Sequence, residues 1–491
     1  MRSLAAALAS AALLISVFPR FDLAWLAPVA LAPLLAAASG ETRLARRFLL
    51  GEASGILYWF GVCYWIRDVL AVYGGMNGAR AWGVFLLFCI GKAVHMGVFT
   101  ALAGPLMRRW YAVPAIAALW VGLERTHGPL GFAWLALGNA GIEMRAPLRL
   151  APWLGVYGVS FVFVMLNVAL ALSVLRRPRR HLAWLLVLPA LLLLPDLPPP
   201  ERGSREAALV QPNIAMHQEW TEESMRRMQD RLARMSLQAA LAPGASAPSL
   251  LIWPESPAPL YFETDERFRG LSQDLARLTR SHFLFGTVAY TPAGRPLNSA
   301  AMVGPSGAPL GRYDKIFLVP FGEFVPPAFG FVTRITQEAG DFTPGREIMV
   351  FRAGEQRPGA FICYESAFPH LVRQFAARGA DVFLNLSNDG YFGHSAAREQ
   401  HLLLARMRAV ENRRWLVRAT NDGITAVVDP AGRVAERWKP YVEHAGRVRY
   451  STVRERTAYS RFGDWFAWLC LLAVVGPAVA GVRLKRLPSA T

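Results

Sequence analysis

Charged residues are scarce in this chain of 491 residues, at 18% of the sequence, while hydrophobic residues make up 53%. This composition, with a mean hydropathy of +0.26, excludes an ordinary soluble protein of this length. The apolar residues are concentrated in residues 1–196 and 463–483, whereas residues 205–455 have the mixed composition of a globular domain. The sequence therefore predicts a membrane region that carries a soluble insert.

Cysteine is also scarce, and its four positions divide in an informative way. Three cysteines lie inside apolar runs, where cysteine behaves as a small apolar residue: Cys63, Cys89 and Cys470. Cys363 is alone in the insert, which excludes a disulfide within that domain. An unpaired cysteine in an exported domain is either buried filler or a reactive group.

Apolar runs of membrane-spanning length, sufficient for about 30 Å of hydrocarbon, predict a helical bundle of about eight spans. The expected spans are 4–19, 21–38, 48–70, 80–104, 111–126, 151–175, 181–196 and 463–483. The first run lacks an A-x-A-like cleavage pattern and is followed by further runs, so we interpret it as a retained span. Seven spans thus form a membrane domain over 1–196, the eighth is a C-terminal helix, and residues 484–491 form a cytoplasmic tail.

Two features inside these spans suggest specific packing or function. Gly51 and Gly55 form a small-xxx-small pattern, which predicts close helix packing. Lys92 and His95 lie within the fourth span, and ionisable residues at membrane depth are candidates for function. A packing role or a side chain that reaches an interface explains Lys92 equally well.

The net charge of +18 would suit a nucleic-acid-binding protein, but the positions of the basic residues indicate membrane topology instead. They cluster between alternate spans, as the positive-inside rule requires: Arg43/Arg46/Arg47, Arg108/Arg109, Arg176/Arg177/Arg179/Arg180 and Arg483/Lys485/Arg486. We therefore expect both termini in the cytoplasm and the insert on the outer side of the membrane. We expect no nucleic-acid partner.

The insert has the pattern of an α/β domain over residues 207–455, preceded by a Pro-rich linker over 197–206. Short apolar runs such as LLIWPE and VFLNLSN alternate with helical patterns at 225–235 and 395–414, which favours buried strands in a layered sheet. Glu255, Lys315 and Cys363 follow such runs, and chemistry gathers at the carboxyl ends of strands.

These three residue types are suited to acyl transfer. A carboxylate takes the thiol proton, the thiolate carries the acyl group as a thioester, and an ammonium group stabilises the oxyanion. Cys363 precedes a helical pattern, so we expect the helix dipole to favour its ionisation. His394 and His401 are seven residues apart, unlike a zinc-binding helix, and we expect neither a metal nor any other cofactor. Taken singly, each candidate residue is more typical of a surface, solvated or packing position.

The flanking residues make the case stronger. WPES (253–256), RYDKIFLVPFGEFVP (312–326) and ICYES (362–366) resemble the carbon–nitrogen hydrolase (nitrilase) superfamily. The more detailed similarity is to its membrane branch, the apolipoprotein N-acyltransferase family, and it extends to SNDGYFG (387–393) and GVYGVSF (155–161). The chain departs from that family's pattern at Ala133, where we expect Pro, and at Tyr391, where we expect Trp.

This resemblance implies a nitrilase-like α-β-β-α sandwich and a ping-pong reaction. An acyl chain would pass from a phospholipid to Cys363 and then to the α-amino group of the N-terminal diacylglyceryl-cysteine of an apolipoprotein. The resemblance implies that Glu255 is the general base and acid, that Lys315 is the oxyanion partner, and that Glu323 orients Lys315. It also implies that Tyr364 and Glu365 support the acyl pocket and that Trp220 lies near the substrate entrance.

The resemblance also implies a monomer in the bacterial inner membrane, surrounded by membrane lipids, with the catalytic domain on the periplasmic side. PPAFGFVTRI (326–335) is a candidate lid that dips into the membrane surface, or a loop packed on its own domain. Two alternatives stay open: a membrane-tethered amidase or nitrilase-type hydrolase, in which water resolves the thioester, and a transporter or receptor with an outward ligand-binding domain.

Overall fold

The computed structural model describes residues 1–128, 132–216, 219–241, 246–255, 258–320, 322–324 and 342–474. The chain forms two compact units. One comprises residues 1–67, 79–197 and 462–491, and the other comprises 68–78 and 198–461. The segment 68–78 thus belongs to the unit that contains the insert, although it lies among the predicted spans.

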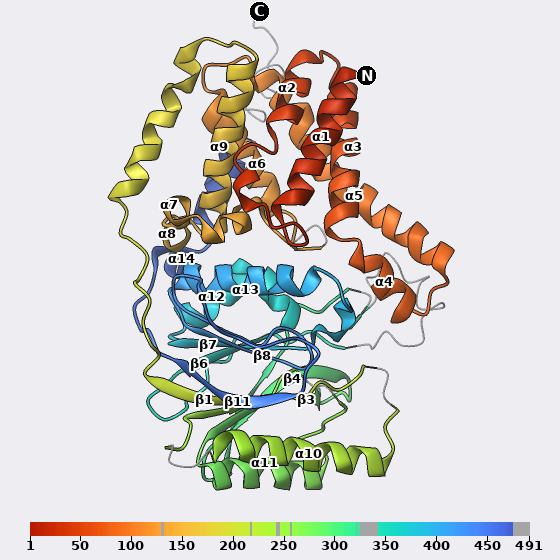
Figure 1. Cartoon of the computed structure of the whole chain (residues 1–491), viewed down its shortest axis with the longest axis vertical. Helices are drawn as coiled ribbons and strands as arrows, with labels where there is room; N and C mark the ends of the chain where they lie inside the picture. The colour runs from red at the N-terminus through yellow and green to blue at the C-terminus, as the bar shows by residue number, and fades with distance from the viewer. Residues whose placement is uncertain are drawn as a thin grey trace, which may run out of the picture. The chain divides into compact units, whose positions relative to one another are not determined.

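The first unit is helical (Figure 1). Its elements are α1 (Arg2–Val17), η1 (Ala24–Leu26), α2 (Ala32–Gly40), α3 (Leu44–Val62), α5 (Gly78–Leu106), α6 (Ala112–Arg125), η2 (Leu137–Glu143), α7 (Arg145–Leu148), α8 (Ala151–Leu154), α9 (Val156–Val174), η3 (Arg179–Leu193) and the helix Trp465–Val474. Helix α4 (Trp65–Val72) follows α3 after a bend of 61°.

Fewer helices than expected qualify as spans by length and composition. Within the described residues, α5 and α9 qualify, and the bent pair α3 and α4 adds a third if it is one span. The helices Arg2–Val17 and Trp465–Val474 are apolar but shorter. The count of eight therefore remains a prediction.

Proline explains where the expected continuous helices are interrupted. The run at 21–38 contains Pro28 and Pro33 and forms η1, turns and α2 in place of one long helix. The run at 181–196 contains Pro189 and forms the 3₁₀ helix η3. The expected span at 48–70 falls on α3 and α4, a pair bent by 61° that forms either one broken span or a re-entrant loop.

The small-xxx-small prediction is confirmed at the contact between α3 and α5. A Cβ atom on Gly51 would lie 2.3 Å from the carbonyl oxygen of Met96, and one on Gly55 would lie 2.9 Å from the Cα atom of Ala93. Only glycine allows the two helices to approach this closely.

The second unit contains two β-sheets, and strands and helices alternate along the chain as predicted. One sheet has the order β11-β1-β2-β3-β4-β5 and the other has the order β10-β9-β8-β7-β6. The strands are β1 (Arg205–Gln211), β2 (Leu250–Ile252), β3 (His282–Tyr290), β4 (Pro296–Val303), β5 (Pro309–Asp314), β6 (Pro358–Ile362), β7 (Val382–Ser387), β8 (Leu416–Thr420), β9 (Ala426–Val428), β10 (Val434–Arg437) and β11 (His444–Tyr450). The helices are α10 (Glu222–Ala240), α11 (Glu266–Thr279), η6 (Cys363–Ala367), α12 (Pro369–Ala377), η7 (Asp389–Phe392), α13 (Ala397–Asn412) and α14 (Ala458–Phe462).

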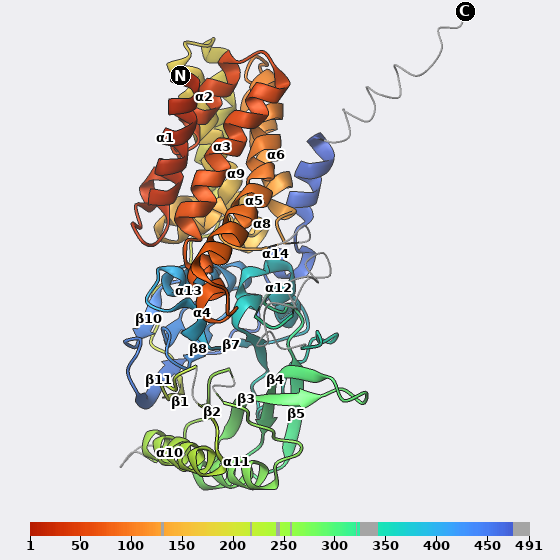
Figure 2. The ribbon, with the colours of Figure 1, turned by 90° about the vertical axis from the view of Figure 1, so that its right-hand side faces the viewer.

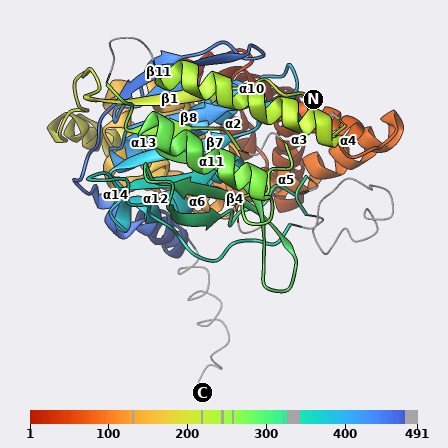
Figure 3. The same cartoon turned by 90° about the horizontal axis from the view of Figure 1, so that it is seen from below.

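The layers of this unit follow the order helix, sheet, sheet, helix. Helices α12 and α13 cover the sheet that contains β6, β7 and β8, and α10 and α11 cover the outer face of the other sheet (Figures 1 and 2). Helices α10 and α11 lie side by side across that face (Figure 3). Met228, Leu232 and Met235 of α10 are buried there with Trp253 and Phe283, as the helical spacing predicted.

Parallel pairing sets the position of the functional residues. Strands β1, β2 and β3 are parallel in one sheet, and β6, β7 and β8 are parallel in the other. Parallel strands end at a common edge of their sheet. Glu255 follows β2, Cys363 follows β6, and Asp389 follows β7.

Candidate active site

Lys315 lies between two carboxylates. Its Nζ atom is 3.1 Å from Oε1 of Glu255 and 2.9 Å from Oε1 of Glu323, and its side chain is 1% exposed. The charges of Glu255 and Glu323 raise the pKa of Lys315 well above its usual range, although burial acts in the opposite direction. The ammonium group is therefore charged at any physiological pH.

Further donors hold the two carboxylates in place. The side-chain amide of Asn298 donates to Oε1 of Glu255 at 2.8 Å and to Oε1 of Glu323 at 2.5 Å. The backbone N–H of Asn388 donates to Oε2 of Glu255 at 2.8 Å, and that of Val319 donates to Oε2 of Glu323 at 2.7 Å. Each carboxylate oxygen has a partner, so the geometry around Lys315 is tightly constrained.

Cys363 stands directly after β6 with a φ of +51°, in the left-handed region that non-glycine residues rarely adopt. It is 6% exposed. Its charge interactions with Glu255 and Lys315 show that the three predicted catalytic groups lie in one cluster. A strained conformation of this kind is typical of functional positions.

The expectation that the thiol of Cys363 ionises easily is wrong. Burial and the negative charge of Glu255 raise the pKa of Cys363 well above its usual range, and Lys315 opposes them only in part. Cys363 opens the short turn η6, and the longer helix α12 begins only at Pro369. The resting group is therefore a thiol, which requires a base to remove its proton as it attacks.

A buried network behind Cys363 holds its backbone. Nε2 of His401 donates to the carbonyl oxygen of Cys363 at 2.9 Å, and Nδ1 lies 3.0 Å from both Oδ1 of Asp389 and a terminal nitrogen of Arg418. Burial and the charge of Arg418 lower the pKa of His401, and Asp389 acts in the opposite direction. Arg418 also donates to both carboxylate oxygens of Asp389, at 2.9 and 2.8 Å.

Asp389 belongs to this network, and its negative charge helps to raise the pKa of the Cys363 thiol. Despite its burial, the guanidinium of Arg418 holds the pKa of Asp389 well below its usual range. The hydroxyl of Ser387 donates to Oδ1 of Asp389 at 2.7 Å. Gly423 makes room for the carboxylate, because a Cβ atom there would lie 2.1 Å from Oδ2.

Glu365 joins the strand end of Cys363 to the segment after Lys315. Its Oε1 atom accepts from the hydroxyl of Tyr313 and the N–H of Ile316, both at 2.7 Å, and its Oε2 atom accepts from the N–H of Ile362 at 2.7 Å. Glu365 is fully buried, and this burial raises its pKa to about 7. Its observed contacts are thus with the backbone and Tyr313.

The other predicted residues occupy distinct positions. Tyr364 is buried and packs edge-on against Phe368, with ring centroids 5.0 Å apart. Trp220 is partly buried in the loop between β1 and α10 and packs on the core beneath α10. Its role at the substrate entrance stays a prediction. The candidate lid at 326–335 lies outside the described residues.

Tyr391, where the chain departs from the expected motif, contacts the segment 68–78. Its ring lies 4.8 Å from that of Tyr73, centroid to centroid, and the Tyr73 hydroxyl donates to the carbonyl oxygen of Gly390 at 2.9 Å. This segment therefore helps to position the loop after β7.

Several residues of the site were missed by reasoning from the sequence. Asn298 lies inside a strand, and its only signal is a polar side chain among apolar neighbours. His401 lies in α13 and Arg418 in β8. From the sequence, His401 was considered only as a metal ligand, and that test gave no sign of its role here. Only the tertiary fold brings Asn298 to the two carboxylates beside Lys315, and places His401 and Arg418 in the network behind Cys363.

Two family models match this chain. Residues 206–444 match the family Carbon-nitrogen hydrolase, so the α/β unit is a nitrilase-like domain. Residues 10–169 match Apolipoprotein N-acyltransferase N-terminal domain. A crystal structure of an amidase from Nesterenkonia sp. is similar at a TM-score of 0.40 and 21% identity, over 55% of this chain and 96% of that chain.

Relatives of full length identify the family. The apolipoprotein N-acyltransferase of Geobacter metallireducens is 34% identical over 98% of this chain and 95% of its own length. That of Azotobacter vinelandii is 32% identical over 85% of each chain. This chain therefore belongs to the apolipoprotein N-acyltransferase family, and it is a membrane protein with several apolar helices.

Proposed function

We propose that this protein transfers an acyl chain from a phospholipid to Cys363, and from there to the α-amino group of the N-terminal diacylglyceryl-cysteine of an apolipoprotein. The observation that carries the proposal is the buried cluster of Glu255, Lys315 and Cys363 in a member of this family. The names of the relatives supply the substrate class, and the cluster supplies the chemistry.

In the first half-reaction, Glu255 takes the proton of the Cys363 thiol while the sulfur attacks the ester carbonyl of the phospholipid. A general base of this kind contributes about 10²- to 10⁴-fold to the rate. The ammonium of Lys315 stabilises the oxyanion of the tetrahedral intermediate. The ester C–O bond then breaks, the leaving alkoxide takes the proton from Glu255, and a thioester and a lysophospholipid result.

In the second half-reaction, the α-amino group attacks the thioester carbonyl. Glu255 accepts a proton from the attacking nitrogen and returns it to the departing sulfur of Cys363, which restores the thiol. Lys315 keeps its charge while Glu255 carries the proton, because the carboxylate of Glu323 stays beside the ammonium group. Glu323 orients Lys315 and leaves Glu255 available for proton transfer.

We further propose that the protein acts as a monomer in the bacterial inner membrane, with both termini cytoplasmic and the α/β unit on the periplasmic side. The distribution of arginine between the apolar runs supports this orientation. Both proposed substrates carry acyl chains, and exposure of a chain to water costs about 0.8 kcal/mol per CH₂. An enzyme anchored in the bilayer avoids that cost.

Mass spectrometry of the intact protein tests the first half-reaction. Incubation with a phospholipid should add one acyl chain, which hydroxylamine removes and which maps to Cys363. The Cys363→Ala variant should take up none, whereas the matched control Cys89→Ala, at a buried cysteine of α5, should be acylated like the parent.

The fate of the acyl group separates the proposal from its alternatives. An acyl-enzyme that persists in water and disappears on addition of a diacylated peptide with a free N-terminus supports acyl transfer. Rapid release of free fatty acid without an amine would indicate a hydrolase. Full function of Cys363→Ala in a lipoprotein-maturation assay would favour a binding or transport role and overturn the proposal.

A further inference from the structure

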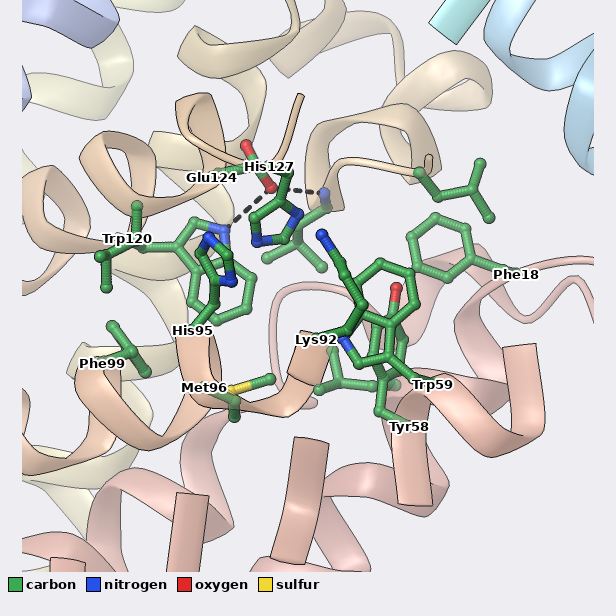
Figure 4. Close-up of a pocket in the computed structure, with 14 residues that line it drawn as sticks. Phe18, Tyr58, Trp59, Lys92, His95, Met96, Phe99, Trp120, Glu124 and His127 are labelled. Carbon is green, nitrogen blue, oxygen red and sulfur yellow. Dashed lines mark hydrogen bonds between the residues drawn. The ribbon is translucent and has the colours of Figure 1, made fainter. Parts of the chain in front are cut away.

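The helical unit contains a cavity of its own, lined by residues of α1, α3, α5 and α6 and the segments that follow α6 (Figure 4). Most of its wall is apolar or aromatic and includes Leu14, Phe18, Phe99 and Leu137. The cavity is open to its surroundings, and its space, with the open part included, is about 540 Å³. No residue of the Glu255 cluster takes part in it.

Lys92 brings a positive charge into this apolar surrounding. It lines the cavity and is 6% exposed. Its ammonium has two partners among the described residues: it donates to the carbonyl oxygen of Phe132 at 2.9 Å, and it lies 5.0 Å from the ring centroid of Trp59. Neither partner carries a negative charge.

The single carboxylate in the wall of the cavity is used elsewhere. Oε1 of Glu124 accepts from the indole N–H of Trp120 at 3.0 Å and from the backbone N–H of Leu137 at 2.8 Å, and Glu124 forms no ion pair with Lys92. The buried ammonium thus lacks a counter-ion in the described part of the chain. A buried charge without a partner is costly, and an ionisable group at membrane depth implies that a partner exists.

Two imidazoles stand beside the ammonium. His95 and His127 line the same cavity, with ring centroids 4.4 Å apart in an edge-to-face contact, and Figure 4 shows Lys92, His95 and His127 gathered on the cavity. Nε2 of His95 lies 3.1 Å from Oγ1 of Thr126. The hydroxyl of Thr126 donates a hydrogen bond to the carbonyl oxygen of Leu123. The polar groups of the wall thus come from a few side chains, and the rest of the wall is apolar or aromatic.

We propose that this cavity is a second lipid site, which binds an acyl chain with an anionic oxyacid head against Lys92. The ammonium supplies the missing charge interaction with a phosphate or carboxylate, and the aromatic and aliphatic wall receives the chain. The bilayer around the helices offers such molecules directly. The site is formed entirely by the helical unit, and the inference does not rest on the proposed acyl transfer.

Native mass spectrometry of the full chain in detergent tests the site. All variants carry Cys363→Ala, so that no acyl transfer competes with binding. Three probes are titrated: dioleoylphosphatidylglycerol, oleate and neutral dioleoylglycerol. We expect the parent to bind an anionic probe at least tenfold more tightly than dioleoylglycerol, and we expect Lys92→Met to abolish that difference. The anionic probe that binds more tightly identifies the head group as phosphate or carboxylate.

Further variants keep the test decisive. Lys92→Arg retains the charge and should retain the preference, whereas Lys439→Met, at an exposed lysine of the other unit, should leave binding unchanged. Leu14→Trp, which fills the cavity and spares Lys92, should weaken binding of all three probes at least tenfold. The proposal is overturned if Lys92→Met binds the anionic probes like the parent, if the parent shows no preference for them, or if Leu14→Trp has no effect.

Discussion

The left-handed backbone of Cys363 has a measurable consequence for stability. A side chain with a Cβ atom in this conformation costs about 1–2 kcal/mol, whereas glycine adopts it without penalty. Glycine loses about 0.5–1 kcal/mol more conformational freedom than alanine when the chain folds. The variant Cys363→Gly should therefore be more stable than Cys363→Ala by about 1 kcal/mol.

Thermal unfolding in detergent, followed by tryptophan fluorescence, measures this difference. A gain of about 1 kcal/mol corresponds to a rise in melting temperature of about 2–4 °C for a unit of this size. The matched control is Ala233→Gly in α10, where the backbone is helical and glycine should cost about 1 kcal/mol. If Cys363→Gly is less stable than Cys363→Ala by an amount like that control, the backbone strain at Cys363 does not exist.

The same assay checks two predictions on buried carboxylates. Asp389→Asn removes the charge that pairs with Arg418, so a fully buried guanidinium loses its counter-ion. We expect the free energy of unfolding to fall by about 3–5 kcal/mol. A fall below about 1 kcal/mol would contradict a stabilising role of this network. Burial raises the pKa of Glu365 from 4.5 to about 7, so the folded state binds this proton more tightly than the unfolded chain. That stabilisation is present below pH 4.5 and is lost as the pH rises through about 7. The melting temperature of the parent should therefore fall relative to that of Glu365→Gln over this pH interval. Parallel pH profiles of the two melting temperatures would refute the prediction.

The strands and the helices of the α/β unit were largely predictable from the sequence. Apolar runs such as HFLFGTVAY coincide with β3, and VFLNLS forms β7. The helical pattern at 225–235 predicted the buried face of α10, where Met228, Leu232 and Met235 are buried and Met225 is partly buried. Such patterns are local, because one apolar face must be buried whatever covers it.

The helical unit was harder to predict from hydropathy alone. The run at 181–196 has the composition of a span but contains Pro189, and it forms a 3₁₀ helix. Hydropathy sums over a window and does not register where a missing N–H or a bend interrupts a helix. The helix packing at Gly51 was predictable, because small residues act through their size alone.

The sequence by itself determined the family, the three candidate catalytic residues and the division into apolar and mixed segments, because motifs and composition are written along the chain. Only the tertiary structure decided that Asn298 holds both carboxylates and that His401 holds the backbone of Cys363. It also reversed the expectation for the thiol, whose ionisation depends on burial and on the charge of Glu255. Electrostatic interactions act through space, and residues far apart in the sequence determine them only once the chain has folded.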